Sequence, residues 1–173
     1  MNEPRLTLVT GGCRSGKSRY ALEQADEFEN PVFIATAEST DEEMRKRIEL
    51  HQAERGEKFY TIERPYDPAS AFSELPPKTD FVLLDCVTVW IGNLLNHYGE
   101  NVNDAGEIER LVQAFENLSC RCIAVTNETG LGIIPMNAMA RQFRDLAGSV
   151  NQRLAEAADS VIMTVCGIPV TIK

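Results

Sequence analysis

Four short runs of apolar residues recur along the chain, and each is separated from the next by a stretch of mixed polarity. The runs cover residues 5–10, 31–36, 81–86 and 122–127 and are rich in Val, Ile, Leu and Thr. They do not alternate with polar residues, which is the pattern of strands whose two faces are both buried. We therefore expect these runs to be the central strands of a sheet that is covered on both sides.

The stretches between the runs have the periodicity of amphipathic helices. They cover residues 17–28, 40–56, 67–75 and 108–118. Thr40 with Glu43, and Asp104 with Glu107, have the spacing of a capping box. Asp67 followed by Pro68 has the pattern of a helix cap and a first helical position, so a helix is expected to begin there as well.

The longest expected helix begins near Asn137. Its apolar residues recur at steps of four and three and form one stripe: Met139, Phe143, Leu146, Val150 and Leu154. Such a stripe favours core packing over a binding role.

The last fifteen residues, 159–173, hold two apolar runs around Gly167, Ile168 and Pro169, which predicts a terminal antiparallel strand pair. Strand–helix alternation over most of the chain predicts a mainly parallel α/β sheet with right-handed crossovers. We expect a single domain that spans residues 1–173.

Composition narrows the classes of function. The formal net charge is −9 and the isoelectric point about 4.8, which argues against broad binding to nucleic acid or to anionic membranes. The N-terminus lacks the pattern of a signal peptide, and no apolar run has the length of a membrane span, so a soluble cytoplasmic protein is expected. Five cysteines at irregular spacing do not indicate a disulfide framework, and the Cys120–Cys122 pair lacks the partners of a zinc site.

Residues 11–18 match the pattern G-x-x-x-x-G-K-[ST] in full, between an expected strand and an expected helix. They are Gly11, Gly12, Cys13, Arg14, Ser15, Gly16, Lys17 and Ser18. The glycines let backbone N–H groups point at phosphate oxygens, and the helix N-terminus adds a partial positive charge. Lys17 can reach the β- and γ-phosphates and Ser18 can hold Mg²⁺. The sequence therefore predicts a nucleotide site.

Polar residues stand at the ends of the other expected strands. Asp85 follows four apolar residues and is the candidate second ligand of Mg²⁺. Because ligands gather at the carboxyl ends of parallel strands, we expect Ser18, Thr36, Asp85 and the Asn127–Glu128 pair to surround one site. Residues 127–135 include two glycines, and their composition fits both a mobile loop over the ligand and an inert turn.

His51 is one of only two histidines and lies in the charged segment after the second strand. Near a triphosphate, an imidazole can act as a general base, or it can attack phosphorus and carry the group as a phosphoramidate. An ordinary surface histidine is the alternative.

Taken together, several motifs resemble one known family. They are the P-loop, the pattern R-I-x-x-H-x-x-x-R from Arg47 to Arg55, the loop N-E-x-G-x-G-I-I-P that starts at Asn127, and the run F-R-D-x-x-G-x-x-N-Q from Phe143 to Gln152. In order and over nearly the whole chain, the sequence is similar to the bifunctional adenosylcobinamide kinase/adenosylcobinamide-phosphate guanylyltransferases of cobalamin assembly. The P-loop is shared with many families, whereas the other three motifs are specific.

The resemblance implies a P-loop NTPase fold of the RecA-like type, assembled as a homotrimer, and two reactions. ATP or GTP would phosphorylate adenosylcobinamide; GTP would then give GMP to adenosylcobinamide phosphate through a guanylylated His51. The implied nucleotide contacts are the eight P-loop residues, Ala35, Thr36, Ala37, Gln52, Ala53, Glu54, Arg55, Glu63 and Asp85. Lys17 would act beside His51 in catalysis, with Mg²⁺ on Ser18 and Asp85.

The chain departs from some members of that family at three places. Leu50 precedes His51 where some members have two adjacent histidines, and Cys13 stands where some have Ala. Asp85 stands where some have Glu, which keeps the charge and shortens the reach toward Mg²⁺.

Two other classes of function stay open on the residues alone. One is a small-molecule kinase without guanylyl transfer, in which His51 is a surface residue. The other is a nucleotide-dependent switch module of the RecA or GTPase type, although the chain has no N-K-x-D motif for reading guanine.

Overall fold

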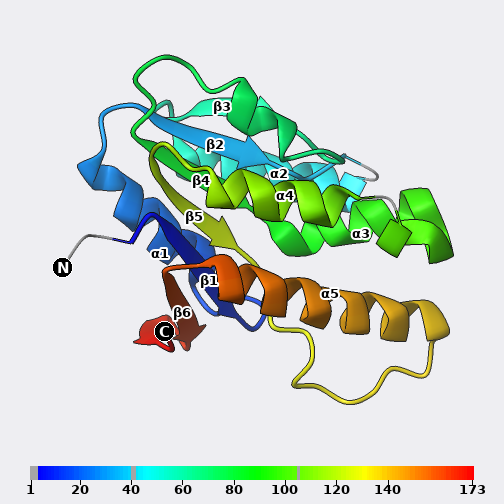
Figure 1. Cartoon of the computed structure of the whole chain (residues 1–173). Helices are drawn as coiled ribbons and strands as arrows, with labels where there is room; N and C mark the ends of the chain where they lie inside the picture. Colours follow the sequence, from blue (N-terminus) through cyan, green and yellow to red (C-terminus); the bar gives the residue numbers. More distant parts are fainter. Residues whose placement is uncertain (1–3, 40–41, 105) are drawn as a thin grey trace.

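The chain forms one seven-stranded sheet with helices on both faces (Figure 1). The computed structural model describes residues 4–39, 42–104 and 106–173. The strand order is β3-β2-β4-β5-β1-β6-β7, and all neighbours are parallel except β6 and β7. The strands are β1 (Leu6–Gly11), β2 (Pro31–Ala35), β3 (Tyr60–Glu63), β4 (Phe81–Asp85), β5 (Arg121–Val125), β6 (Ser160–Val165) and β7 (Ile168–Thr171). The expected parallel α/β sheet with a terminal antiparallel pair is confirmed.

The helices divide between the two faces of the sheet. They are α1 (Lys17–Gln24), α2 (Glu42–Arg55), α3 (Val87–Tyr98), α4 (Glu107–Glu116) and α5 (Ala138–Ala157), with short 3-10 helices η1 (Ala25–Glu27), η2 (Ser70–Ser73) and η3 (Gly99–Asp104). Helices α3, α4 and α5 lie together over one face, and α1 packs against the other (Figure 1).

Successive residues of each central strand enter two different cores, as the unbroken apolar runs predict. In β4, Val82 and Leu84 pack into the larger core beside Trp90 of α3. Phe81 and Leu83 point the other way and join the smaller core against α1. All four side chains of the strand are at most 1% exposed, so the strand is held from both sides and its end at Asp85 is fixed in place.

Two elements were not predicted from the sequence. β3 lies at the edge of the sheet and buries only Ile62, so its four residues carry too little pattern to identify a strand. α3 buries six of its twelve residues between the sheet and its neighbours. Because it is apolar around most of its circumference, it lacks the one-sided stripe by which a surface helix is recognised.

Two predicted helix starts were wrong. The segment at Asp67 folds as turns and the 3-10 helix η2, whose cap position is Ala69. The cap position of α4 is Gly106 and not Asp104, because a left-handed residue (φ +80°) turns the chain out of η3 and into α4. Thr40, the proposed cap of α2, lies outside the described residues.

The start of α5 was predicted correctly. The Asn137 side chain accepts a hydrogen bond from the Ala140 N–H at 3.2 Å. Leu146, Val150 and Leu154 are buried, and Phe143 packs against the same core. Met139 departs from the expected stripe because it lies in the first turn, beyond the core, and is 54% exposed.

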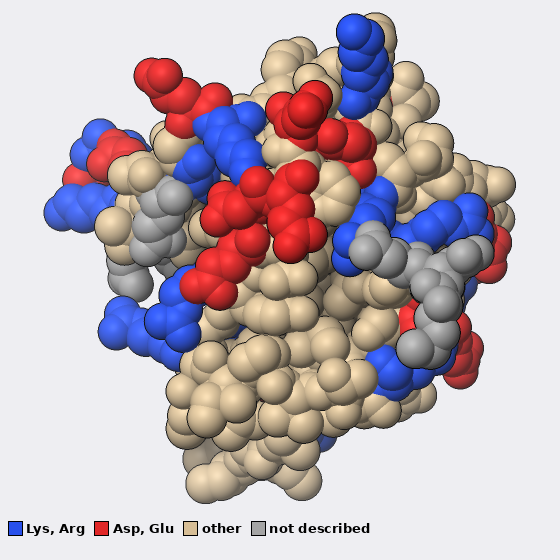
Figure 2. All heavy atoms as spheres, turned by 90° about the vertical axis from the view of Figure 1, so that its left-hand side faces the viewer, with Lys and Arg blue, Asp and Glu red and all other residues tan. Residues whose placement is uncertain are grey.

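The surface carries charges of both signs. Figure 2 shows lysines, arginines and acidic residues intermingled over the upper part of one face, above a part with few charges. Within the described residues, no helix combines the length and apolar character that crossing a membrane requires.

Candidate functional site

The loop between β1 and α1 has the backbone that the P-loop pattern requires. Gly11 has φ +144° and Gly16 has φ +100°, conformations that side chains disfavour. A Cβ on Gly11 would lie 2.5 Å from the Thr164 carbonyl oxygen, so glycine is the residue that fits against β6. The Gly167 N–H donates to the Ser15 carbonyl at 2.9 Å, and the Ser15 and Thr164 hydroxyls are 2.7 Å apart. The β6–β7 hairpin thus supports the loop.

Lys17 is folded into this loop. Its Nζ donates to the carbonyl oxygens of Gly11 at 3.1 Å and Gly12 at 2.7 Å, and the residue is 7% exposed. The ammonium group is therefore held inside the loop, against the backbone of its first two glycines.

The carboxyl ends of the strands bring the predicted polar residues into one row. Glu63 pairs with Ala35, and Ala35 pairs with Asp85. Asp85 pairs in turn with Val125 of β5. Thr36 follows Ala35 directly, so the expected residues of β2, β3 and β4 reach the same edge of the sheet.

Asp85 is the centre of this edge. Burial raises the pKa of its carboxyl, and a hydrogen bond from Ser18 and the charges of His51, Lys17 and Arg55 counteract that rise. The charge of His51, on α2, therefore acts on the Asp85 carboxyl, as that of Lys17 in the P-loop does. Asp85 thus responds to groups from the P-loop and from α2, and their assignment to one site remains a prediction.

Arg55 anchors the end of the helix that carries His51. Its guanidinium lies 3.9 Å from the centroid of the Phe33 ring, and its Nε donates to the His51 carbonyl at 3.2 Å. Burial lowers the pKa of Arg55, while the negative charges of Asp85 and Glu63 act in the opposite direction. Among the described residues, none accepts a hydrogen bond from its buried Nη1.

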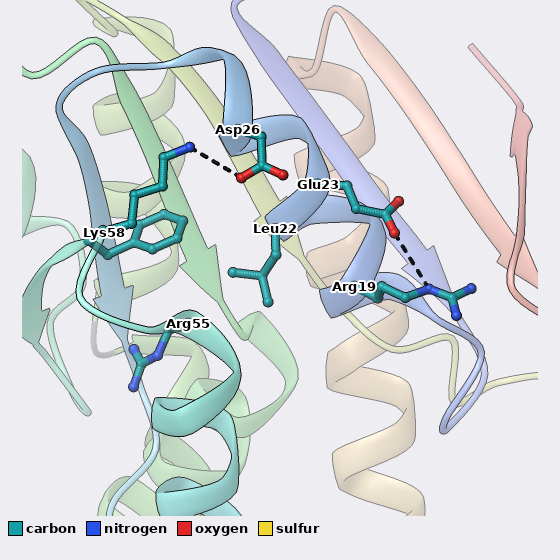
Figure 3. A pocket seen from close by; sticks show the side chains of 7 residues that line it. Arg19, Leu22, Glu23, Asp26, Arg55 and Lys58 are labelled. Carbon is teal, nitrogen blue, oxygen red and sulfur yellow. Dashed lines mark hydrogen bonds and ion pairs between the residues drawn. The ribbon is translucent and has the colours of Figure 1, made fainter.

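A hollow of about 420 Å³ adjoins Arg55 between α1 and the C-terminal end of α2 (Figure 3). Its other charged residues form ion pairs: Lys58 with Asp26 at 3.2 Å, and Arg19 with Glu23 along α1 at 3.8 Å. Because these charges are compensated, the hollow itself provides no strongly anionic or cationic site.

Thr36 ties β2 to the residue after Asp85. Its hydroxyl donates to the Cys86 carbonyl at 2.8 Å and accepts from the Cys86 N–H at 2.9 Å. Burial, with the Asp85 charge, raises the pKa of Cys86 to about 12, so this thiol is not a nucleophile at neutral pH. Asn93 of α3 adds a bond from its amide to the Thr36 carbonyl at 2.8 Å.

The end of β5 is held by a second network. The Thr126 hydroxyl donates to Asn151 Oδ1 at 2.7 Å, and Asn151 Nδ2 donates to the Asn127 carbonyl at 3.1 Å. The Asn127 N–H donates to the Thr88 hydroxyl at 2.6 Å. The Glu128 N–H then donates to the Gly11 carbonyl at 3.0 Å, which places Asn127 and Glu128 next to the P-loop.

Sequence reasoning missed the supporting residues Thr88, Asn93 and Asn151. Asn151 belongs to the run shared with the resembling family, but neither the pattern nor the spacing gave it a role. Thr88 and Asn93 lie on the unpredicted α3. The only sign of their role in the sequence was that each is a polar residue in an otherwise apolar segment.

The remaining predicted contacts lie on the P-loop, after β2 and on α2, and most of them are exposed. Cys13 and Arg14 are exposed at the crest of the loop, and Ala37 is half-buried beyond β2. Gln52 and Ala53 are exposed on α2 beside His51, and the Glu54 side chain lies outside the described residues.

Ser18 and Asp85 supply a hydroxyl and a carboxylate side by side, which suits Mg²⁺ that is also bound by phosphate oxygens and water. Among the described residues, no group of three or more His, Cys, Asp and Glu side chains could hold a metal ion by itself.

The model of one protein family, described as cobinamide kinase / cobinamide phosphate guanyltransferase, matches residues 7–172. The chain is 40% identical over 181 residues to the bifunctional adenosylcobalamin biosynthesis protein CobU of Escherichia coli (strain K12), covering 97% of this chain and 99% of that one. It is also 40% identical over 167 residues to the bifunctional adenosylcobalamin biosynthesis protein CobP of Pseudomonas aeruginosa, covering 96% of each chain.

Solved structures support the fold at much lower sequence identity. A Pyrococcus horikoshii OT3 protein is 11% identical with a TM-score of 0.60, over 98% of this chain and 86% of that one. The RadB recombinase is 14% identical with a TM-score of 0.52, over 91% of this chain and 73% of its own. These likenesses confirm the RecA-like P-loop architecture and carry no information on substrate.

Proposed function

The chain belongs to the cobinamide kinase / cobinamide phosphate guanyltransferase family, and we propose that it performs both reactions at the site around Asp85. The observation that carries this proposal is the P-loop backbone folded around Lys17 beside the strand end at Asp85, a carboxyl on which Ser18, Lys17 and His51 all act. A phosphate-binding lysine and a nucleophilic imidazole are thereby available to one nucleotide.

In the first reaction, the terminal hydroxyl of adenosylcobinamide attacks the γ-phosphorus of ATP or GTP. The bond from that phosphorus to the β-phosphate oxygen breaks, the nucleoside diphosphate leaves, and the hydroxyl proton passes to water or to a nearby base. Positioning by the P-loop amides and by Lys17 contributes most of the catalysis. Mg²⁺ between Ser18 and Asp85 would neutralise phosphate charge.

In the second reaction, neutral His51 attacks the α-phosphorus of GTP and pyrophosphate leaves. The phosphate of adenosylcobinamide phosphate then attacks the same phosphorus, the P–N bond breaks, and His51 is released with adenosylcobinamide-GDP as product. The covalent intermediate lets pyrophosphate leave before the large acceptor arrives. Arg55, with its Nε on the His51 carbonyl, supports the helix end during this exchange.

The nucleotide would extend from the P-loop across the ends of β2 and β3. Ala35, Thr36, Ala37 and Glu63 lie along that edge, and Gln52, Ala53, Glu54 and Arg55 follow His51 on α2. We assign these residues to GTP binding on the strength of the family motif and of the register that aligns Glu63, Ala35 and Asp85.

Three further proposals accompany this one. Strand–helix alternation throughout the sequence supports a single unit over residues 1–173, and the family resemblance supports assembly as a homotrimer. The acidic composition supports action in the cytoplasm on small-molecule substrates without nucleic acid.

A labelling experiment tests the proposal. The protein is incubated with Mg²⁺ and GTP labelled at the α-phosphate, beside His51→Asn and His97→Asn. His97 is the matched control because it is the chain's other histidine, exposed on α3, with its ring tilted against that of Tyr66 at 5.3 Å between centroids. Acid-labile, base-stable label on the wild type and on His97→Asn, but not on His51→Asn, is the expected result.

Retention of label by His51→Asn would place the covalent step elsewhere. Absence of label from a wild type that still binds GTP would leave a kinase without guanylyl transfer.

A further inference from the structure

Residues 131–136, between β5 and α5, expose a set of large apolar side chains, and Met139 in the first turn of α5 adds to it. Leu131 is 79% exposed, Ile133 96% and Met136 99%, with Ile134 at 65% and Met139 at 54%. Figure 1 shows this segment as an extended loop that runs beside α5, outside the layers of the fold. Clustered apolar exposure of this kind marks a binding surface, because scattered single residues are ordinary but a contiguous group is not.

The segment is also free of charge. From Thr129 to Ala140 the sequence has no Asp, Glu, Lys or Arg, although 25% of the chain is charged. A surface of this composition does not attract a nucleotide, whose phosphates need the cations and amides of the P-loop. It suits a ligand with a broad apolar body and neutral polar groups.

Both ends of the loop are fixed, and one is fixed to the P-loop. At the start, the Glu128 N–H donates to the Gly11 carbonyl at 3.0 Å. At the end, Arg141 Nη1 donates to the carbonyl oxygens of Pro135 at 3.0 Å and Met136 at 2.7 Å, and Asn137 caps α5. The apolar side chains are therefore presented from a frame that is continuous with the nucleotide site.

We propose that residues 131–136 are the acceptor subsite, where the apolar side chains bind the corrin body of the substrate. This inference rests on the proposed function. The corrin macrocycle has methyl-bearing edges and neutral amide side chains, which match an uncharged apolar surface. Both acceptors, the alcohol and its phosphate ester, share that body, so one surface outside the nucleotide site serves both reactions in turn.

The test uses the double variant Leu131→Ser/Ile133→Ser in the full-length protein. Both side chains are almost fully exposed, so their removal leaves the core intact. The matched control is Ile172→Ser, which removes an isoleucine that is 62% exposed beyond β7 and away from this loop. Self-guanylylation with α-labelled GTP is measured first, because it needs no acceptor and reports on the proposed function alone.

Discharge of the guanylylated enzyme is then compared with two acceptors. We expect the double variant to be labelled like the wild type and to be discharged normally by pyrophosphate, which regenerates GTP without a corrinoid. Its KM for adenosylcobinamide phosphate is expected to rise at least tenfold, as the loss of two apolar contacts implies. Equilibrium dialysis with adenosylcobinamide, followed by its visible absorbance, should show the same loss of affinity, and Ile172→Ser should behave as wild type.

An unchanged acceptor KM in the double variant would overturn the inference. A changed assembly state of that variant in light scattering would also overturn it, because the loop would then be a contact between copies of the chain. A wild type that takes no label would instead reject the proposed function, and the two failures are thus distinguishable.

Discussion

The hydroxyl of Ser18 and the carboxylate of Asp85 are hydrogen-bonded to each other across the gap between α1 and β4. The first residue closes the P-loop and the second ends a strand buried on both faces, so their meeting is fixed by the sheet register. The Ser18 hydroxyl holds the buried Asp85 carboxyl in place for a cation. The burial of that carboxyl also has a measurable effect on the stability of the folded protein.

Burial raises the pKa of Asp85, so the folded protein keeps a proton that the unfolded chain has already lost over some interval of pH. The resulting stability is fully present below the unfolded-state pKa and is lost as the pH rises through the folded-state pKa. We therefore expect Asp85→Asn, without ligand, to be more stable than the wild type by about 1–3 kcal/mol at neutral pH. The difference should shrink in acid.

Thermal unfolding at about pH 5 and about pH 8 measures this difference. Added Mg²⁺ and GTP should reverse the order, because the wild type binds them and the variant lacks the carboxylate. A ligand-free variant that unfolds below the wild type at the higher pH would contradict the prediction.

Two adjacent glycines of the P-loop should respond very differently to substitution. A Cβ on Gly11 would meet the Thr164 carbonyl oxygen at 2.5 Å and would also occupy a disfavoured φ of +144°, whereas nothing lies within 4 Å of a Cβ on Gly12. We expect Gly11→Ala to lose about 2–4 kcal/mol of unfolding free energy and Gly12→Ala less than about 1 kcal/mol. Chemical denaturation of both variants gives the comparison, and equal losses would show that β6 yields to the added methyl group.

The elements that could be predicted from the sequence are those whose residue pattern is set locally or by burial on both faces. The strands β1, β2, β4 and β5 were predictable because burial on both faces demands unbroken apolar runs, and their polar ends then had to share one edge. The P-loop was predictable because its chemistry is local in sequence.

The elements that were missed depend on tertiary packing. α3 is apolar around most of its circumference because it is enclosed, and β3 is an edge strand with one buried residue. Asn151 is separated from Asn127 by 24 positions, and only folding shows that its amide holds the end of β5. The charge of His51 acts on Asp85 although 34 positions separate the two residues, and this too depends on the tertiary fold.

The Asn151 side chain should matter for both stability and turnover. It accepts from the Thr126 hydroxyl and donates to the Asn127 carbonyl, so Asn151→Leu would leave both polar groups without this partner. We expect a loss of about 1–3 kcal/mol of unfolding free energy and a fall in the kinase kcat, because the strand end beside Gly11 is no longer held. The nearby Gln152→Leu serves as control, since Gln152 is exposed on the same helix. Similar loss in both variants would argue against a specific role for the network.

We predict that self-guanylylation depends on the planar shape of the Arg55 guanidinium as well as on its charge. Its guanidinium stacks on Phe33 at 3.9 Å while its Nε holds the His51 carbonyl at 3.2 Å, a geometry that needs a planar, forked group. Arg55→Lys keeps the charge but loses both features, so we expect the rate of self-guanylylation to fall by about tenfold or more, as for about 1–2 kcal/mol of lost positioning.

Phe33→Leu keeps the arginine and removes the aromatic face beneath it, together with the ring contact of Phe33 to Phe59, so its rate should fall less than that of Arg55→Lys. Arg45→Lys is the surface control, because Arg45 pairs with Glu42 in the exposed first turns of the same helix. Single-turnover labelling with α-labelled GTP at saturating concentration measures the three rates. A full rate in Arg55→Lys would mean that a point charge is sufficient and that the stacked geometry has no part in presenting His51.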